Sequence, residues 1–156
     1  MLKQLDRLNV EADSRYASEQ ELQFLKIYLG SVDQRISAYK KICDSEDKIL
    51  DQTKAQLDAK NPNLFNSGSK DHSEIWRRDI SIVLRCSAAA MLINDLDYLR
   101  ENLLLWHRTI VNANKMVHIS RATYEVLPGI IKQFLTPDEA ELMMPIIQLD
   151  KSILSQ

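Results

Sequence analysis

The side chains that could perform chemistry in this chain are three histidines, two cysteines and scattered carboxylates. His72, His107 and His118 fall in expected loops and near expected helix ends, so the sequence does not group them as metal ligands or as a catalytic base. Cys43 and Cys86 are too few for a disulfide framework or a zinc site. No phosphate-binding loop, dinucleotide fingerprint, serine-hydrolase elbow or zinc-protease motif occurs. Because no nucleophile is paired with a base, we expect the chain not to be an enzyme.

The composition is typical of one soluble helical domain. The chain has 156 residues, of which 45% are hydrophobic and 27% charged. Lys and Arg number 20 and Asp and Glu 22, so a net charge of −2 provides no long-range attraction for nucleic acid or anionic lipid. The 3 glycines and 4 prolines leave little material for hairpins, which favours an all-α fold. No apolar run approaches the ~20 residues that span a bilayer, and the cysteine usage suggests a reduced, cytosolic setting.

Apolar residues at helical spacing predict seven or eight helices of uneven length, which favours a globin-like arrangement over a regular four-helix bundle. Ser18 with Glu21, and Thr136 with Pro137 and Glu139, are typical helix starts. The predicted helices cover approximately residues 2–10, 18–30, two stretches between 32 and 60, 73–93, 96–111, a helix capped by Ser120 that ends or kinks near Pro128, and a last one from 137. Residues 61–73 are expected to form a loop.

Three further residues have expected positions in the core. Trp76 and Trp106 lie on apolar helix faces, where packing into the core is the usual role of an indole. Cys43 is interpreted as a small buried hydrophobic residue.

One stretch resembles the central pigment-binding helix of the phycobiliproteins, most closely that of the allophycocyanin α-type subunit. It consists of Trp76-Arg77-Arg78-Asp79, then Val83-Leu84-Arg85 and Ala90-Met91-Leu92, with Asn94-Asp95 at the following turn. In that family the helix carries C-x-R-D, a tyrosine pair with Leu-Arg, and a Gly-Asp turn. Arg15-Tyr16-Ala17-Ser18 and Lys60-Asn61-Pro62 resemble further segments of the family, so the resemblance covers nearly the whole chain.

The resemblance implies a single domain over residues 1–156 with the globin-like phycobiliprotein fold. Residues 1–30 would form an N-terminal two-helix extension that associates with another subunit, and residues 31–156 would form the globin-like core.

The chain departs from the family pattern where the pigment is attached. Trp76 stands at the position of the cysteine that bonds the bilin, and an indole cannot form the thioether. Cys86 lies ten positions later, about 280° around and ~15 Å along a helix, so it is not a substitute. Ile82 and Val83 replace the tyrosine pair. We therefore expect a phycobiliprotein-like subunit that lacks a covalent bilin.

Two polar residues of the pigment helix remain. The resemblance implies that Arg78 would bind a bilin propionate and that Asp79 would accept hydrogen bonds from the pyrrole N–H groups. Together with Trp76, Ile82 and Val83 they form the predicted bilin-pocket-like site. The alternative is that both are ordinary surface residues near a helix start, where an aspartate is favoured by the helix dipole.

The resemblance also implies a subunit interface. In the family an acidic residue of the N-terminal helices meets the partner's arginine from the Leu-Arg pair. Here Glu11 or Asp13 would be the acid and Arg85 the arginine, with Arg15 and Tyr16 in the same N-terminal segment. The alternative is two unrelated surface charges.

The leading hypothesis is a phycobilisome-related structural, regulatory or assembly subunit in photosynthetic light harvesting. Its partners would be a second copy or a β-type phycobiliprotein subunit, together with phycobilisome core or linker proteins. Its location would be cytoplasmic, at the thylakoid's cytoplasmic face. The alternative is a carrier or sensor that binds a bilin or haem non-covalently, with His107 or His118 as the iron ligand. A bilin lyase or isomerase is disfavoured because no nucleophile–base pair is present.

Overall fold

Helices make up most of the computed structural model, which describes residues 1–67 and 70–156. The expected all-α, globin-like fold is confirmed. The elements are α1 (Leu2–Glu11), α2 (Gln23–Gly30), α3 (Val32–Lys60), the two-residue strands β1 (Asn66–Ser67) and β2 (Lys70–Asp71), α4 (Ser73–Ile93), α5 (Leu96–Leu99), the π-helical segment η1 (Arg100–Leu104), α6 (Leu105–Ala113), α7 (Val117–Phe134) and α8 (Pro137–Leu154).

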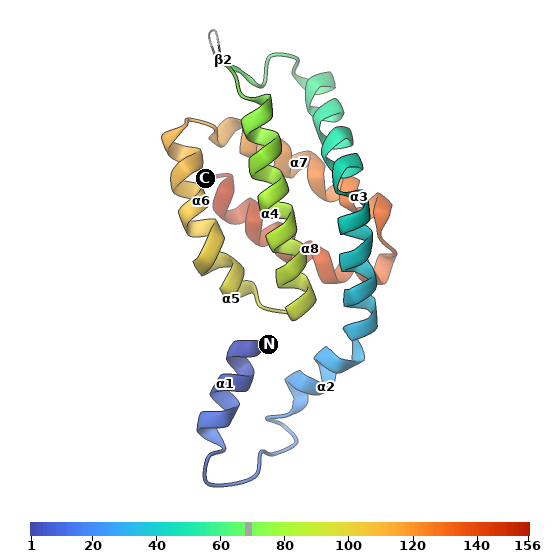
Figure 1. The fold of residues 1–156 in the computed structure, drawn as a ribbon, viewed down its shortest axis with the longest axis vertical. Coiled ribbons are helices and arrows are strands. Elements are labelled where there is room, and N and C mark those ends of the chain that lie inside the picture. The colour runs from blue at the N-terminus through green and yellow to red at the C-terminus, as the bar shows by residue number, and fades with distance from the viewer. Residues whose placement is uncertain (68–69) are drawn as a thin grey trace.

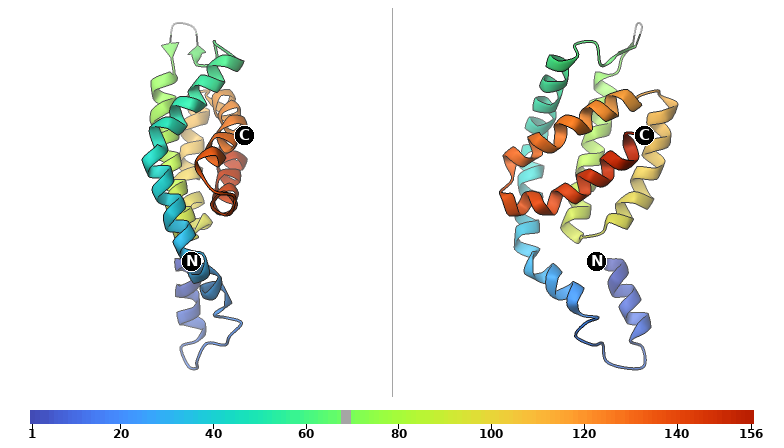
Figure 2. Two further views of the ribbon diagram at one scale, coloured as in Figure 1. Left: turned by 90° about the vertical axis from the view of Figure 1, so that its right-hand side faces the viewer. Right: turned by 180° about the vertical axis from the view of Figure 1, so that it is seen from behind.

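The helices pack in two layers, with the N-terminal extension at one end. α3, α4 and the α5–α6 segment lie side by side, and α7 and α8 cross behind them (Figures 1 and 2). α8 contacts α3, α4, α6 and α7, so its inward face lies in the core. α1 and α2 project beyond the two layers (Figure 1).

The extension is attached to the body at the C-terminal end of α4. The Tyr28 hydroxyl donates to the Leu92 carbonyl over 3.1 Å, and the buried Arg35 guanidinium donates to the Met91 carbonyl. Carbonyls in the last turn of a helix have no partner within the helix, and Tyr28 supplies a donor to one of them, that of Leu92. The Met91 carbonyl also accepts from the Asn94 amide at 3.2 Å, so Arg35 is its second donor.

α3 is one continuous helix, although the sequence predicts two shorter ones. Ile42, Ile49 and Leu57 are buried at intervals of seven and eight residues, so one apolar stripe faces the core along much of its length. Cys43 lies one position off this stripe and is exposed. The expectation that Cys43 is a buried residue is therefore wrong.

α7 begins earlier and ends later than the sequence predicts. Its N-cap is Met116, so Ser120 lies inside the helix. Pro128 does not end the helix, which continues to Phe134. A proline inside a helix costs about 3 kcal/mol. Burial of Leu127 and Ile131 on either side of Pro128 stabilises the helix against this cost.

The π-helical turn η1 changes which side of the next helix faces the core. Leu99 and Leu104 are both buried, five residues apart, which matches the i to i+5 repeat of a π-helix. His107 and Val111 continue the buried stripe, and Trp106 is 62% exposed. The expectation that Trp106 packs in the core is wrong, because the π-turn holds one residue more than an α-turn and shifts the stripe by one position.

The capping box predicted at the start of α8 is confirmed, and it also joins α8 to α3. The Thr136 hydroxyl accepts from the Glu139 amide, and the Glu139 carboxylate accepts from the Thr136 amide at 2.8 Å. The same carboxylate accepts from Ser37 and from Lys41, each at 2.7 Å. Burial opposes ionisation of Glu139, but these hydrogen bonds outweigh it and lower the pKa to about 2.

Glu139→Gln should destabilise the protein near neutral pH and remove part of its acid sensitivity. The native pKa of Glu139 is about 2 and the unfolded value is higher, so its stabilisation is present above the unfolded pKa and is lost as the pH falls through that window. We expect a loss of about 1–3 kcal/mol in the free energy of unfolding near pH 7, which shrinks toward pH ~2, measured by urea unfolding. The exposed Glu141→Gln is the control; an equal loss at all pH values would contradict the assignment.

Candidate functional site

A small cavity lies beneath Trp76, at the position that the sequence predicts for the pigment site. Its volume is about 40 Å³. The lining comes from α4, α6 and α7, the Met116 N-cap and the last residue of α8: Trp76, Asp79, Ile80, Val83, His107, Val111, Met116, Ile119, Ser120, Thr123, Tyr124 and Leu154. Ligand pockets usually measure about 300–1,000 Å³, whereas one buried water needs roughly 10–15 Å³. The cavity has room for a few water molecules.

Trp76 is fixed in place by contacts with α7 and with the loop before β1. Its indole N–H donates to the Thr123 hydroxyl over 2.9 Å, and that hydroxyl donates to the Ile119 carbonyl. The ring centroids of Trp76 and Phe65 are 5.2 Å apart. Trp76 is only 4% exposed, so the indole occupies the interior and borders the cavity.

His107 is the cavity residue whose position depends on the π-turn. Its side chain is buried, and burial lowers its pKa, although the nearby Asp79 carboxylate opposes this shift. The imidazole is therefore mainly neutral at pH 7. Since α-helical spacing places Trp106 inward, periodicity alone does not identify His107 as a cavity residue. His118, the other histidine considered as an iron ligand, is exposed.

The predicted bilin-pocket residues are divided between the cavity and the surface. Trp76, Asp79 and Val83 line the cavity, whereas Arg78 and Ile82 are exposed on the outer side of α4. Arg78 donates to its neighbour Asp79 through Nε at 3.0 Å and Nη2 at 2.9 Å. The guanidinium of Arg78 is therefore at the surface and does not line the cavity.

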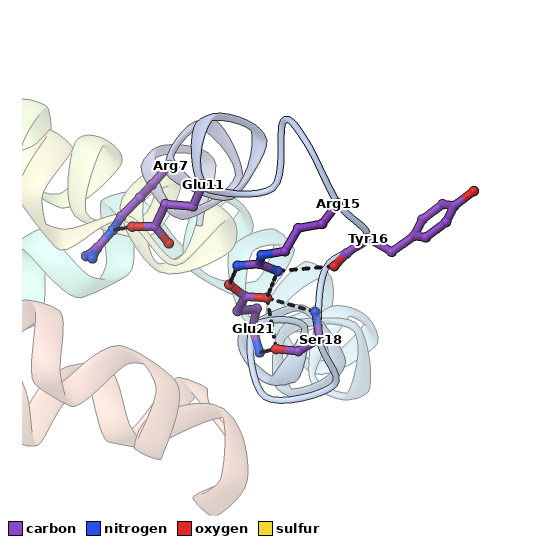
Figure 3. A network of polar contacts seen from close by, with 6 residues as sticks. All are labelled: Arg7, Glu11, Arg15, Tyr16, Ser18 and Glu21. Carbon is purple, nitrogen blue, oxygen red and sulfur yellow. Dashed lines mark hydrogen bonds and ion pairs between the residues drawn. The ribbon is translucent and has the colours of Figure 1, made fainter.

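The N-terminal helix pair, residues 1–30, exposes much of its apolar surface. Among the residues that the structure describes, α2 buries none of its side chains. Ile27 and Leu29 of α2 and Val10 of α1 are exposed, and Tyr16 between the helices is 99% exposed. Figure 3 shows Tyr16 pointing away from the rest of the chain.

The charged residues of this pair are largely satisfied by one another. Arg15 pairs with Glu21 at 2.7 Å, and the Glu21 carboxylate also accepts from the Ser18 amide at 2.8 Å (Figure 3). Ser18 and Glu21 thus make capping-box contacts, but the predicted helix start at Ser18 is wrong, because α2 begins at Gln23 with Leu22 as its N-cap. Arg7 pairs with Glu11 at 2.6 Å. Asp13 is exposed and has no ion-pair partner within residues 1–67 and 70–156.

Arg85 lies on the face of α4 that borders α3. Its guanidinium donates to both carboxylate oxygens of Glu46 at 2.8 Å, and it remains 66% exposed. The chain itself thus pairs Arg85 with Glu46, and contact between Arg85 and Glu11 or Asp13 would require a second subunit.

Across the described part of the chain, no group of three or more His, Cys, Asp or Glu side chains could hold a metal ion. None of the described helices is long and apolar enough to cross a bilayer.

The fold and the site define an all-α, globin-like protein with an N-terminal helix pair and a small cavity beside the central helix. The family described as "Phycobilisome protein" matches residues 8–149, so the chain belongs to the phycobilisome protein family. No curated protein matches the chain. Membership supports a phycobiliprotein-like role in light harvesting.

Trp76→Ala should strongly destabilise the chain, whereas Trp106→Ala should have little effect. Removing the buried indole enlarges the cavity and leaves the Thr123 hydroxyl without its donor, at an expected cost of about 3–5 kcal/mol. The exposed Trp106 provides the matched control, with an expected change within about 0.5 kcal/mol. Urea unfolding of both variants measures the difference, and similar losses would contradict the burial of Trp76.

Proposed function

We propose that this chain is a phycobiliprotein-like structural or assembly subunit of the phycobilisome that carries no covalent bilin, with allophycocyanin α as its nearest type. The observation that supports a role in assembly is the exposed apolar surface of α2. Phe24, Leu25, Ile27, Tyr28 and Leu29 occupy five of its eight positions, and none is buried within the described chain. Contact between water and so much apolar surface is unfavourable, and a partner subunit that packs on α2 would exclude the water.

Two observations support the absence of a covalent pigment. Trp76 stands at the expected attachment position and occupies the interior with its indole. Cys86 is half-buried, and burial followed by the nearby Asp150 raises the pKa of its thiol. The thiolate is the nucleophile in bond formation with a bilin, so this cysteine is poorly suited to replace the missing one.

The pigment part is tested by producing the chain in cells that also make phycocyanobilin and bilin lyases. We expect no zinc-fluorescent band to remain with the chain after denaturation in acid urea, because no reactive thiol lies at the site. A pigmented phycobiliprotein subunit in the same cells is the positive control. A covalent adduct on this chain would contradict the proposal.

The structure favours Asp13 over Glu11 as the acidic partner of an arginine in another subunit. Glu11 is already paired with Arg7, whereas Asp13 is exposed and has no ion pair among the described residues. The arginine would be Arg85 of a second copy, or its equivalent in a β-type subunit. The guanidinium of Arg85 remains exposed and can donate to a second carboxylate in addition to that of Glu46.

Asp13→Lys should weaken association with the partner by about tenfold or more, since it places like charges together. Sedimentation of the chain, alone and mixed with a β-type phycobiliprotein subunit, measures the dissociation constant. Glu19→Lys, in the same exposed loop, is the control for charge and should leave affinity nearly unchanged. Unchanged affinity of the Asp13 variant, or a chain that stays monomeric in both samples, would contradict the proposed interface.

A non-covalent tetrapyrrole carrier or sensor is the second candidate. Asp79 and His107 border the same cavity, which is the observation that favours it. A cavity of about 40 Å³ would have to open by displacement of Trp76, so its volume favours the colourless subunit. Visible absorption that leaves the chain on denaturation would identify the carrier.

We place the protein in the cytoplasm, at the thylakoid surface.

A further inference from the structure

Asp150 is a carboxyl group enclosed in the core. It lies on α8, its exposure is 0%, and one of its oxygens accepts a hydrogen bond from the Ser87 hydroxyl of α4 at 2.8 Å. Its other oxygen, Oδ1, has no hydrogen-bond partner among the described residues. An ionised carboxylate offers about four acceptor positions, so one hydroxyl is a poor replacement for water.

A second buried polar group lies nearby on α7. Tyr124 is 1% exposed, and its hydroxyl also has no hydrogen-bond partner within the described part of the chain. Burial, and then the nearby Asp150 carboxylate, raises the pKa of this phenol. Ser87, Asp150 and Tyr124, here called the Asp150 cluster, thus bring polar groups of α4, α8 and α7 near one another in the core, and only Ser87 and Asp150 are hydrogen-bonded.

No positive charge compensates Asp150 within residues 1–67 and 70–156. On α4 the nearest titratable neighbour is Cys86, whose thiol pKa is raised by burial and then by Asp150 itself. On α8 the neighbouring Lys151 is partly exposed to solvent. Burial raises the pKa of Asp150, and the hydrogen bond from Ser87 lowers it.

The polar groups of the other helices that pack on α8 are engaged elsewhere. On α3, Arg35 donates to Ser31 and to the Met91 carbonyl, Thr53 donates to the Ile49 carbonyl, and Lys41 pairs with Glu139. On α6, the pKa of His107 is lowered by burial and is affected by the charges of Asp79 and Arg78. On η1, Arg100 and Glu101 are exposed.

We propose that the Asp150 cluster makes the core sensitive to pH, because ionisation of Asp150 loosens the packing of α8 against α4 and α7. The neutral carboxyl needs less solvation than the carboxylate and can itself donate a hydrogen bond. The carboxylate would be a charge in the core with a single donor, and the structure relieves it by admitting water between the helices. Trp76 can serve as a probe of this change, because it lines the same cavity as Tyr124 of the cluster.

The direction of the effect follows from the proton balance. Burial raises the pKa of Asp150 to about 8, against a lowering contribution from Ser87. The unfolded chain has the ordinary value of about 3.9, so between these two pH values the native state holds a proton that the unfolded state has released. Stability from this group is fully present below the unfolded pKa and falls as the pH rises, by up to about tenfold in the unfolding constant per pH unit.

The experiment follows Trp76 fluorescence and urea unfolding from pH ~6 to pH ~10. Trp106→Phe serves as the background, because it removes the exposed indole and leaves Trp76 as the only tryptophan. We expect the emission of Trp76 to shift to longer wavelength as the pH rises, together with a fall in stability. In Asp150→Asn, which mimics the neutral acid in shape, both changes should disappear.

A second variant keeps the test decisive if the asparagine chain does not fold. Ser87→Ala removes the hydrogen bond that favours the carboxylate, so it should move the midpoint of the fluorescence change to higher pH. A loss of packing alone would lower stability at every pH without moving the midpoint. The proposal is overturned if the parent chain shows no transition, if the transition persists in Asp150→Asn, or if the midpoint stays unchanged in Ser87→Ala.

Discussion

The C-terminal end of α4 is where two parts of the molecule are joined. The last carbonyls of any α-helix need donors from beyond the helix, and here Tyr28 of α2 donates to Leu92 while Arg35 of α3 joins the Asn94 amide as a donor to Met91. The Arg35 guanidinium lies over the Tyr28 ring, 5.6 Å from its centroid, so the same two side chains also hold one another. Beyond this contact α2 projects away from the core (Figure 1), and its apolar side chains are not buried by the rest of the described chain.

At the opposite end of α4, Trp76 occupies the interior where the proposed function expects no covalent pigment. Trp76 supplies apolar bulk and one hydrogen bond to Thr123, so the site becomes part of the hydrophobic core. The neighbouring Arg78 is exposed and pairs with Asp79. With the indole in the interior, the cavity beside it measures only about 40 Å³, which agrees with the proposed role of the outer surface of the subunit.

Much of the fold could be predicted because local patterns and tertiary packing agree. The capping box of Thr136 and Glu139 forms where its sequence indicates, and Asn94, with φ of 53°, ends α4 at the predicted break. The order of motifs identified the family, which the match over residues 8–149 supports. The π-turn was not predictable, because the i to i+5 repeat of Leu99 and Leu104 is hidden among other leucines.

The sequence by itself determined the helical class and the family, since these depend on residue types and on local spacing. Only the tertiary structure decided which side chains meet. The shift at η1 placed His107 in the cavity and Trp106 in solvent, packing on α3 gave Arg85 the partner Glu46, and the crossing of α8 enclosed Asp150. Each of these outcomes depends on which helix lies opposite, and the spacing of residues along one helix does not contain that information.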